Sequence, residues 1–251
     1  PLGYEERIRR KLAVPGDLAA LGGSTAAHLS GYLGMVARLD EAFGRLVEAL
    51  HSLGRLEDTI ILFTSDHGCH FKTRNNEYKR SCHEASIRVP TLLHGPGFED
   101  VGAFDGLVSL VDLAPTLLDA AGLAIPEIMQ GRSLLRTIRG GEAPREDIFV
   151  QISEHHVGRA LRTRRWKYEV EAPGGDGWND PASDLYAEAR LYDLEEDPNE
   201  LRNLVASPAH AETRAVLRGR LLALIEEAGE TRPEFLSVES RNWHEGLVSE
   251  G

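Results

Sequence analysis

The hydrophobic positions of the first half predict a long helix followed by a buried strand. Between Ser24 and Gly54, apolar residues recur every three or four positions, at Leu29, Leu33, Val36, Leu39, Phe43, Leu46, Val47, Leu50 and Leu53. Ser24 or Thr25 can cap the start of this helix, and Gly54 can end it. Residues 59–63 are then almost continuously apolar, which indicates a strand buried on both faces. The order is therefore helix, short turn, strand.

The next segments predict a polar loop, two further strands and a short helix. Residues 66–87 are rich in charged and amide side chains, and loops of that length inside a compact domain are usually functional. Residues 89–93 and 107–110 have the composition of strands. Asp112 can cap the helix that follows, which carries Pro115 in its first turn and ends near Gly122.

From residue 147 the pattern changes to short runs separated by turns, which is typical of an antiparallel sheet. The runs cover residues 148–152, 159–162, 166–170 and 191–194. A helix at about 208–228 is expected to pack on this sheet. Its inward side would carry Val216, Leu217, Leu221, Leu224 and Ile225. The polar tail after Gly229 is expected to be loosely held. The pattern thus predicts a first domain over 1–146 and a smaller α+β subdomain over 147–251.

Composition narrows the functional class. The chain has 251 residues, of which 41% are hydrophobic and 27% charged, as is typical of a soluble globular protein. A net charge of −12 argues against a nucleic-acid partner. No apolar run approaches the roughly 20 residues of a membrane span. Cys69 and Cys82 are too few for a disulfide framework, so cytoplasm and periplasm both stay open. Residues 1–4 contain no initiator Met or signal peptide, and we expect them to be internal to a longer protein.

The strand at 59–63 is followed directly by an acid and an imidazole, Asp66 and His67. Ligands of open α/β sheets gather at such strand ends. A carboxylate with an imidazole suits calcium, magnesium, manganese or zinc. The alternative is that Asp66 caps a turn and His67 is an ordinary loop residue. Lys79, in the polar loop, can clamp a sulfate or phosphate oxygen, and its alternative role is a solvated surface charge.

Other clusters are more ambiguous. The pairs Cys69-His70 and Cys82-His83 could hold a structural zinc, although their spacing fits no known zinc module and reduced loop cysteines are favoured. A basic run could grip an anionic substrate, but a solvated strand face is favoured; it comprises Arg159, Arg162, Arg164, Arg165 and Lys167. For His155 and His156 the same two interpretations stay open. Trp166 and Tyr168 alternate as core residues of a half-buried strand would.

Several motifs together resemble the sulfatase family of the alkaline-phosphatase superfamily. They are residues 64–68 (TSDHG), 78–79 (YK), 83–90 (HEASIRVP), 110–118 (LVDLAPTLL), 131–134 (GRSL), 162–168 (RTRRWKY) and 191–200 (LYDLEEDPNE). The resemblance runs over most of the chain. It implies an α/β fold, an alkaline-phosphatase-like sheet flanked by helices and present in part, with a small C-terminal α+β subdomain that contains an antiparallel sheet.

The resemblance also implies roles for individual residues. Asp66 and His67 match the pair that supplies two ligands to a divalent cation, usually calcium. Histidine in the second place also occurs in related phosphodiester and phosphonate monoester hydrolases, which use manganese; magnesium is a further possibility. Lys79 matches the lysine that contacts the sulfate oxygens, and His83 lies beside the expected substrate pocket. The implied substrate is a small-molecule or saccharide sulfate ester.

One departure from the family is large. Sulfatases carry a Cys-x-Pro-Ser-Arg or Ser-x-Pro-Ser-Arg motif whose Cys or Ser becomes formylglycine, the nucleophile, and no such motif is present. The paired N-terminal aspartates of the metal site are absent too. The chain therefore matches the C-terminal half of a sulfatase. We expect it to be inactive and marginally stable alone, with an exposed sheet edge. Its partner is expected to be an N-terminal half or, in a homo-oligomer, a second copy of the chain. The alternative function is that of a non-catalytic pseudoenzyme.

Overall fold

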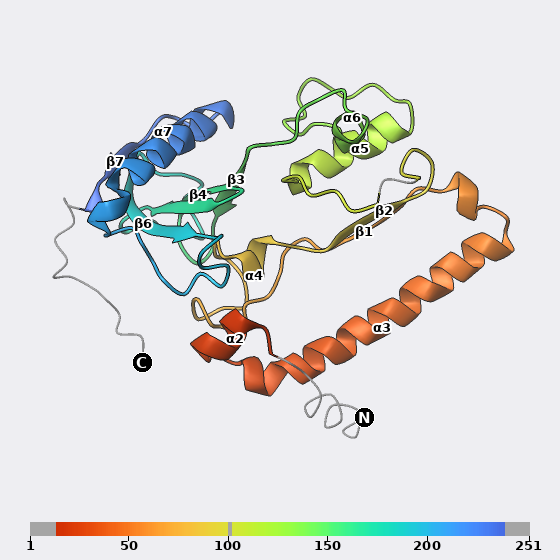
Figure 1. Ribbon diagram of the computed structural model, residues 1–251, viewed down its shortest axis with the longest axis horizontal. Helices are drawn as coiled ribbons and strands as arrows, with labels where there is room; N and C mark the ends of the chain where they lie inside the picture. Colours follow the sequence, from red (N-terminus) through yellow and green to blue (C-terminus); the bar gives the residue numbers. More distant parts are fainter. Residues whose placement is uncertain (1–13, 100–101, 239–251) are drawn as a thin grey trace. The chain divides into compact units, whose positions relative to one another are not determined.

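The computed structural model describes residues 14–99 and 102–238, and the chain divides into two compact units. The first unit ends at Arg145 and the second begins at Glu146 (Figure 1). The expectations for residues 1–4 and for the end of the tail lie outside the described residues. No helix of the described ranges combines the length and the apolar character that crossing a membrane requires.

The first unit is built around a long helix and a two-stranded antiparallel sheet (Figure 1). Its first elements are α2 (Gly16–Leu21), α3 (Thr25–Ser52), the 3-10 helix η1 (Leu56–Asp58), β1 (Ile61–Thr64), α4 (Glu84–Ile87) and β2 (Thr91–His94). Helix α3 has the bounds that the apolar period predicts. It ends where Gly54 adopts φ +64°, a conformation that glycine tolerates without strain.

Strands β1 and β2 pair antiparallel, with Ile61 opposite His94 and Thr64 opposite Thr91. Phe43 of α3 meets Phe63 of β1 edge to face, with ring centroids 5.2 Å apart. The expectation that the strand at 59–63 is buried on both faces is wrong for the described residues. Phe63 of β1 is 39% exposed, and Leu92 of the paired strand β2 is 52% exposed. The physical reason is that this sheet has only two strands within the described ranges.

The expected strand at 107–110 is not formed. Leu107 makes one isolated bridge with Arg145, and the chain then turns into the 3-10 helix η2 (Leu110–Asp112), α5 (Leu113–Ala120) and α6 (Leu134–Ile138). Hydrogen bonds favour the helical turn over a strand, because Ser109 and Asp112 form a reciprocal capping box. Arg145 also grips the fully buried Asp112 carboxylate with two hydrogen bonds of 2.7 and 2.5 Å.

Burial acts to raise the pKa of Asp112, but the hydrogen bonds from Arg145 and from the Arg132 and Ser109 N–H groups outweigh it, and the pKa lies below its usual value. Asp112 is therefore charged in the folded protein. Sequence analysis assigned this residue as a helix cap; the structure makes it the acceptor that ties three segments of the first unit together.

The second unit is a five-stranded sheet covered on one face by a helix (Figure 1). The strands, in spatial order, are β3 (Asp147–Ile152), β4 (Gly158–Thr163), β5 (Trp166–Glu171), β6 (Leu185–Asp193) and β7 (Glu234–Leu236). All pairs are antiparallel except β6–β7, which is parallel. The 3-10 helix η3 (Pro208–His210) leads into α7 (Ala211–Glu227). The predicted antiparallel sheet and its packing helix are confirmed.

The segment after Gly229 is not loose as far as it is described. Glu234 N donates to Asp184 O at 2.8 Å and opens β7, and Phe235 packs against the Tyr186 ring with centroids 6.2 Å apart. On α7 the buried apolar residues are Leu217, Leu221, Leu224 and Ile225. Val216 was expected among them, but it is 67% exposed because it sits one position off that stripe.

A bulge in β6 places two charged side chains, Glu188 and Arg190, on opposite faces of the sheet. Glu169 pairs with Arg190 and Val170 with Glu188, so Ala189 is the extra residue. Glu188 and Arg190 are two apart and would share a face in a regular strand. Instead, Glu188 accepts a hydrogen bond from Tyr168 Oη at 2.9 Å on the helix-covered face, and Arg190 reaches Glu169 at 2.5 Å on the other.

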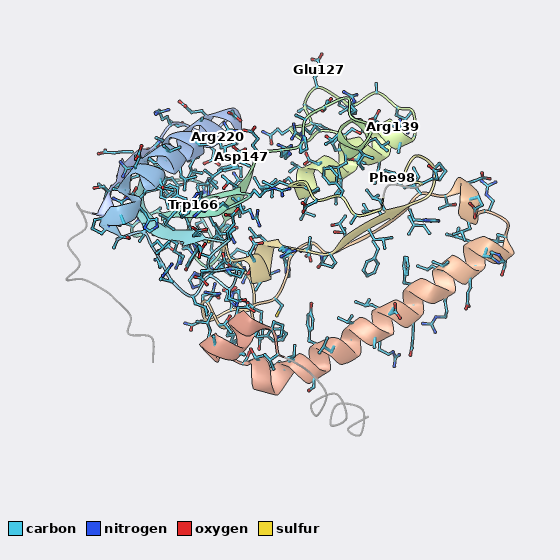
Figure 2. The ribbon with its side chains drawn as sticks, in the orientation of Figure 1. Phe98, Glu127, Arg139, Asp147, Trp166 and Arg220 are labelled. Carbon is cyan, nitrogen blue, oxygen red and sulfur yellow. The ribbon has the colours of Figure 1, made fainter. Side chains whose placement is uncertain are left out.

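Two members of the basic run, Arg159 and Lys167, form buried ion pairs. Arg159 is 2% exposed and lies 2.9 Å from Glu230, while the fully buried Lys167 lies 2.5 Å from Glu200. For these two residues the favoured interpretation, a solvated strand face, is wrong, because each side chain is buried and paired with a carboxylate. Arg220 of α7 likewise pairs with Asp147 at the start of β3 (Figure 2).

Candidate active site

Asp66, His67 and Lys79 come together in the first unit, just beyond the end of β1. Lys79 Nζ lies 2.7 Å from His67 Nε2, and Asp66 Oδ2 lies 3.3 Å from the same nitrogen. The Asp66 side chain is 82% exposed and the His67 side chain 40%. A carboxylate, an imidazole and an ammonium group thus converge on one point that solvent reaches.

The bonding of the His67 ring fixes which nitrogen faces this point. His67 Nδ1 is 2.8 Å from Gly68 O, and a carbonyl oxygen can only accept, so Nδ1 carries the hydrogen. The lone pair is then on Nε2, directed at Lys79 and Asp66. A neutral imidazole with an accessible nitrogen lone pair is the form that binds a metal ion.

Asp66 is held in its charged form. Desolvation acts to raise its pKa, but the hydrogen bond from His67 N to Asp66 Oδ1, at 2.9 Å, and the charge of Lys79 outweigh it, so the pKa is lowered. Oδ2 faces the His67 ring nitrogen. The pair therefore offers one oxygen and one nitrogen to a cation.

The position of Lys79 depends on two residues that the sequence did not single out for this role. His70 Nε2 donates to Lys79 O at 2.9 Å, and Asn75 Nδ2 donates to Lys79 O and Arg80 O at 3.2 Å each. His70 is fully buried. Both residues fix the backbone of Lys79 rather than its ammonium group, and no periodic pattern marks them.

The structural zinc considered for the two Cys-His pairs is not formed. His70 uses Nε2 on a backbone carbonyl, Cys82 is fully buried, and both cysteines are free thiols. Among the described residues, one group of three potential ligands has its atoms close together, and it contains none of these four residues. His83 precedes α4 and is 3% exposed. Its contact with substrate stays a prediction.

Gly68 allows the loop that carries Asp66 and His67 to pass close to α4. Its N–H donates to Ser86 O at 2.7 Å, and a Cβ at this position would lie 2.1 Å from Ala85 O. We expect Gly68→Ala to push the loop off α4 and cost about 1–3 kcal/mol of local stability. Hydrogen exchange read by mass spectrometry should then speed up over residues 64–88 and stay unchanged over 147–230. Gly44→Ala is the matched control, since a Cβ there meets nothing within 4 Å. Equal protection in both variants would refute the expectation.

Comparison with known proteins decides the family. The profile named Sulfatase matches residues 5–123, and the profile named N-sulphoglucosamine sulphohydrolase, C-terminal, matches residues 77–227. The chain belongs to the sulfatase family. The two profiles together cover the Asp66, His67 and Lys79 cluster and most of the second unit of this sulfatase-family chain.

Individual relatives agree. Arylsulfatase K of Mus musculus is 36% identical over 184 residues, which are 69% of this chain and 32% of the relative. The chain thus spans about a third of the length of the curated relatives it matches. A structure solved in complex with its substrate, D-glucosamine-2-N,6-O-disulfate, superposes with a TM-score of 0.70 over 91% of this chain and 46% of that one, at 24% identity. The phosphonate monoester hydrolase of Agrobacterium radiobacter gives a TM-score of 0.66 at 27% identity, over 80% and 42% of the two chains.

Proposed function

We propose that this chain carries part of the active site of a metal-dependent hydrolase of sulfate esters. The observation that supports the proposal most is the meeting of Asp66, His67 and Lys79 at one solvent-accessible point, 2.7 and 3.3 Å apart, in a sulfatase-family chain. The 36% identity to arylsulfatase K adds to it. The substrate would be a small-molecule or saccharide sulfate ester.

The residues present fit a divalent cation. Asp66 Oδ2 and His67 Nε2 would hold it, because the first is ionised and the second has its lone pair free of a hydrogen. The carboxylate suits calcium, our first candidate, while the imidazole also suits manganese, with magnesium a third candidate. Such a cation would stabilise negative charge on the sulfate oxygens. Lys79 would donate hydrogen bonds to the same oxygens and neutralise part of their charge.

The nucleophile is the part of the site for which the sequence offers no candidate. None of the 251 residues forms the formylglycine motif. We propose that the nucleophile and the remaining metal ligands come from outside this chain, either from an N-terminal half or from a partner subunit, and that the 251-residue chain alone does not turn over aryl sulfates. A pseudoenzyme is the opposing outcome.

A second candidate activity is hydrolysis of phosphonate monoesters or phosphodiesters. Two observations favour it: histidine at position 67, and the 27% identity to the Agrobacterium radiobacter enzyme. Sulfate esters remain the first choice because the arylsulfatase K relatives are more similar in sequence. The two activities share the metal and the lysine, so only their relative rates separate them.

Lys79→Met tests the proposal. The variant is made in a protein that also contains the proposed N-terminal half or partner subunit. Loss of one positioned donor to a developing oxyanion lowers kcat by about 100- to 1,000-fold, and we expect a loss of that size for p-nitrophenyl sulfate. Lys72→Met is the control, because Lys72 is an exposed lysine of the same loop that stacks over Tyr78, 5.1 Å from the ring centroid. It should change the rate by less than about twofold.

The same assay separates the alternatives. Chelator treatment should abolish turnover, and re-addition of calcium or manganese should restore it. Faster hydrolysis of p-nitrophenyl phenylphosphonate than of the sulfate would favour the second activity. Equal losses in Lys79→Met and Lys72→Met would contradict the assigned role of Lys79, and absence of turnover with every ester and metal would favour the pseudoenzyme.

A further inference from the structure

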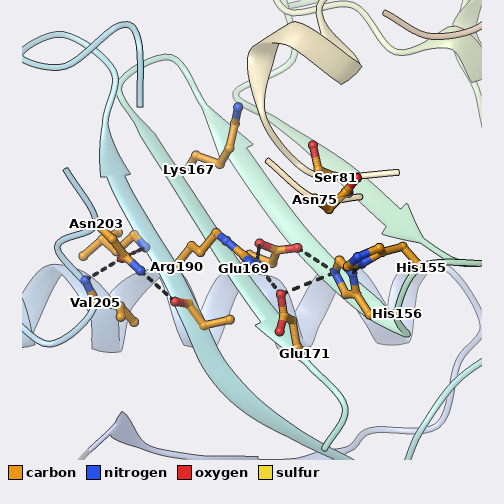
Figure 3. A network of polar contacts seen from close by, with 12 residues as sticks. Asn75, Ser81, His155, His156, Lys167, Glu169, Glu171, Arg190, Asn203 and Val205 are labelled. Atoms are coloured by element: carbon orange, nitrogen blue, oxygen red, sulfur yellow. Dashed lines mark hydrogen bonds and ion pairs between the residues drawn. The ribbon is translucent and has the colours of Figure 1, made fainter. Parts of the chain in front are cut away.

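The second unit contains a compact polar cluster on the sheet (Figure 3). His156 lies in the turn between β3 and β4, Glu169 and Glu171 are on β5, and Arg190 is on β6. His156 Nε2 is 3.1 Å from a Glu169 oxygen and 3.5 Å from a Glu171 oxygen. One atom of each of the three residues lies within 4.8 Å of the others. None of the motifs used for the proposed function includes His156, Glu171 or Arg190.

We propose that His156, Glu169 and Glu171 form a binding site for a zinc-class divalent cation, and that the Arg190 guanidinium occupies this site in the metal-free protein. Zinc takes imidazole nitrogen at about 2.0–2.1 Å and carboxylate oxygen at about 2.0–2.2 Å, in tetrahedral geometry. Neighbouring ligand atoms are then about 3.3–3.6 Å apart. The two nitrogen-to-oxygen distances of 3.1 and 3.5 Å are close to that separation.

The ligands are already oriented. Glu169 and Glu171 are two apart on β5, so both project from the same face of the sheet. The His156 ring lies over Gly158, where a Cβ would come within 2.8 Å of Nε2, so glycine makes room for it. His156 Nδ1 is 2.9 Å from His155 Nδ1, which leaves Nε2 to face the carboxylates. Histidine ligands of metals commonly have their second nitrogen hydrogen-bonded in this way.

Charge balance supports a cation at this point. Glu169 is fully buried, and an isolated buried carboxylate is costly unless a positive group accompanies it. Arg190 Nη1 supplies that group, 2.5 Å from Glu169 and also in contact with Glu171. The Arg190 side chain is 28% exposed, so it can turn toward solvent when a metal ion takes its place.

The mixed ligand set favours zinc over calcium. Calcium takes six to eight oxygen ligands, whereas zinc accepts both imidazole nitrogen and carboxylate oxygen in a four-coordinate site, so three protein ligands leave a fourth position open. Burial acts to lower the pKa of His156, but its hydrogen bond to Glu169 and the charge of Glu171 outweigh this, and the pKa is raised. Metal binding requires a deprotonated histidine nitrogen, so the titration is done at about pH 8.

Zinc titration of the 251-residue chain by calorimetry tests the proposal. We expect one zinc bound at the cluster, with an affinity at least tenfold lower in His156→Gln and in Glu171→Gln. Arg190→Gln should raise the affinity, because it removes the competing cation; a cluster that only stabilises the fold would not gain affinity on losing its arginine. Circular dichroism checks folding, and the partly exposed Glu171 provides a variant that avoids disturbing the buried Glu169.

The matched control is His67→Gln, which lies in the other unit and is expected to leave zinc binding at the cluster unchanged. If zinc binding is lost in His67→Gln and kept in His156→Gln, the metal belongs to the Asp66 and His67 pair and the cluster is not a site. Absence of zinc binding in both wild type and Arg190→Gln would also overturn the proposal. The proposed hydrolase function is tested separately, because the ester assays do not depend on this cluster.

Discussion

Replacing Glu188 with glutamine is expected to lower the free energy of unfolding of the second unit by about 3–5 kcal/mol. The Glu188 side chain is fully buried between the sheet and α7. One of its oxygens accepts from Tyr168 Oη at 2.9 Å, the other from Val238 N at 2.9 Å. Arg214 and Arg218 of α7 lie 3.1 and 2.9 Å from the carboxylate. The substitution removes the carboxylate charge beside the nearly buried Arg214 guanidinium, and removing one partner of a buried ion pair costs that amount.

Urea unfolding followed by tryptophan fluorescence measures this effect, because Trp166 and Trp178 are both in the second unit. The control is Glu226→Gln on α7, whose side chain is 47% exposed and pairs with a 57% exposed Arg232. Exposed pairs contribute about 0–1 kcal/mol, so this variant should unfold close to wild type. Similar losses in the two variants would show that burial of Glu188 is not what makes it important.

Glu200→Gln is expected to be comparably destabilising, by about 3–5 kcal/mol, because it leaves a buried ammonium group beside a neutral amide. Lys167 Nζ and Glu200 Oε1 are 2.5 Å apart, and their side chains are 0% and 2% exposed. Adding Lys167→Met to Glu200→Gln removes the buried ammonium charge as well. We therefore expect the double variant to be more stable than Glu200→Gln alone, although it carries one more substitution.

A double-mutant cycle built from these variants and Lys167→Met isolates the coupling between the two residues, using the same urea and fluorescence measurement. A coupling energy of several kcal/mol is the expected result. Additive effects of the two substitutions would mean that the pair does not act as a unit. Arg165→Ala is a useful comparison, because its guanidinium is 47% exposed beside Asp193 and should contribute less.

Helices and the second sheet could be predicted from the sequence because their patterns are long and regular. Helix α3 follows the apolar spacing from Leu29 to Leu53, and α7 follows the stripe from Leu217 to Ile225. The strand expected at 107–110 failed for a tertiary reason: four apolar or small residues look like a strand, but Asp112 and its partner Arg145, 33 positions away, draw the segment into a 3-10 turn.

For the candidate site, the sequence suggested which residues carry chemistry, and the structure shows Asp66, His67 and Lys79 in mutual reach. Their roles in metal and substrate binding stay predictions. The supporting residues His70 and Asn75 could not be predicted, because they act through backbone carbonyls in an irregular loop. The buried cations were misjudged for a similar reason: nothing local to Lys167 reveals that Glu200 neutralises it.

The extra residue Ala189 makes the length of β6 as important as its composition. If the bulge were lost while Ala189 stayed in the strand, the alternation would run uninterrupted from Tyr186, and Arg190 would project into the apolar layer beneath α7 alongside Glu188. Two arginines already occupy the helix side of that layer, Arg214 and Arg218, so a third guanidinium would meet like charge and lose both carboxylates that now hold it. An additional residue taken into the regular strand here would exchange the inside and outside of the sheet, whereas deletion of Ala189 itself would leave every side chain on its present face.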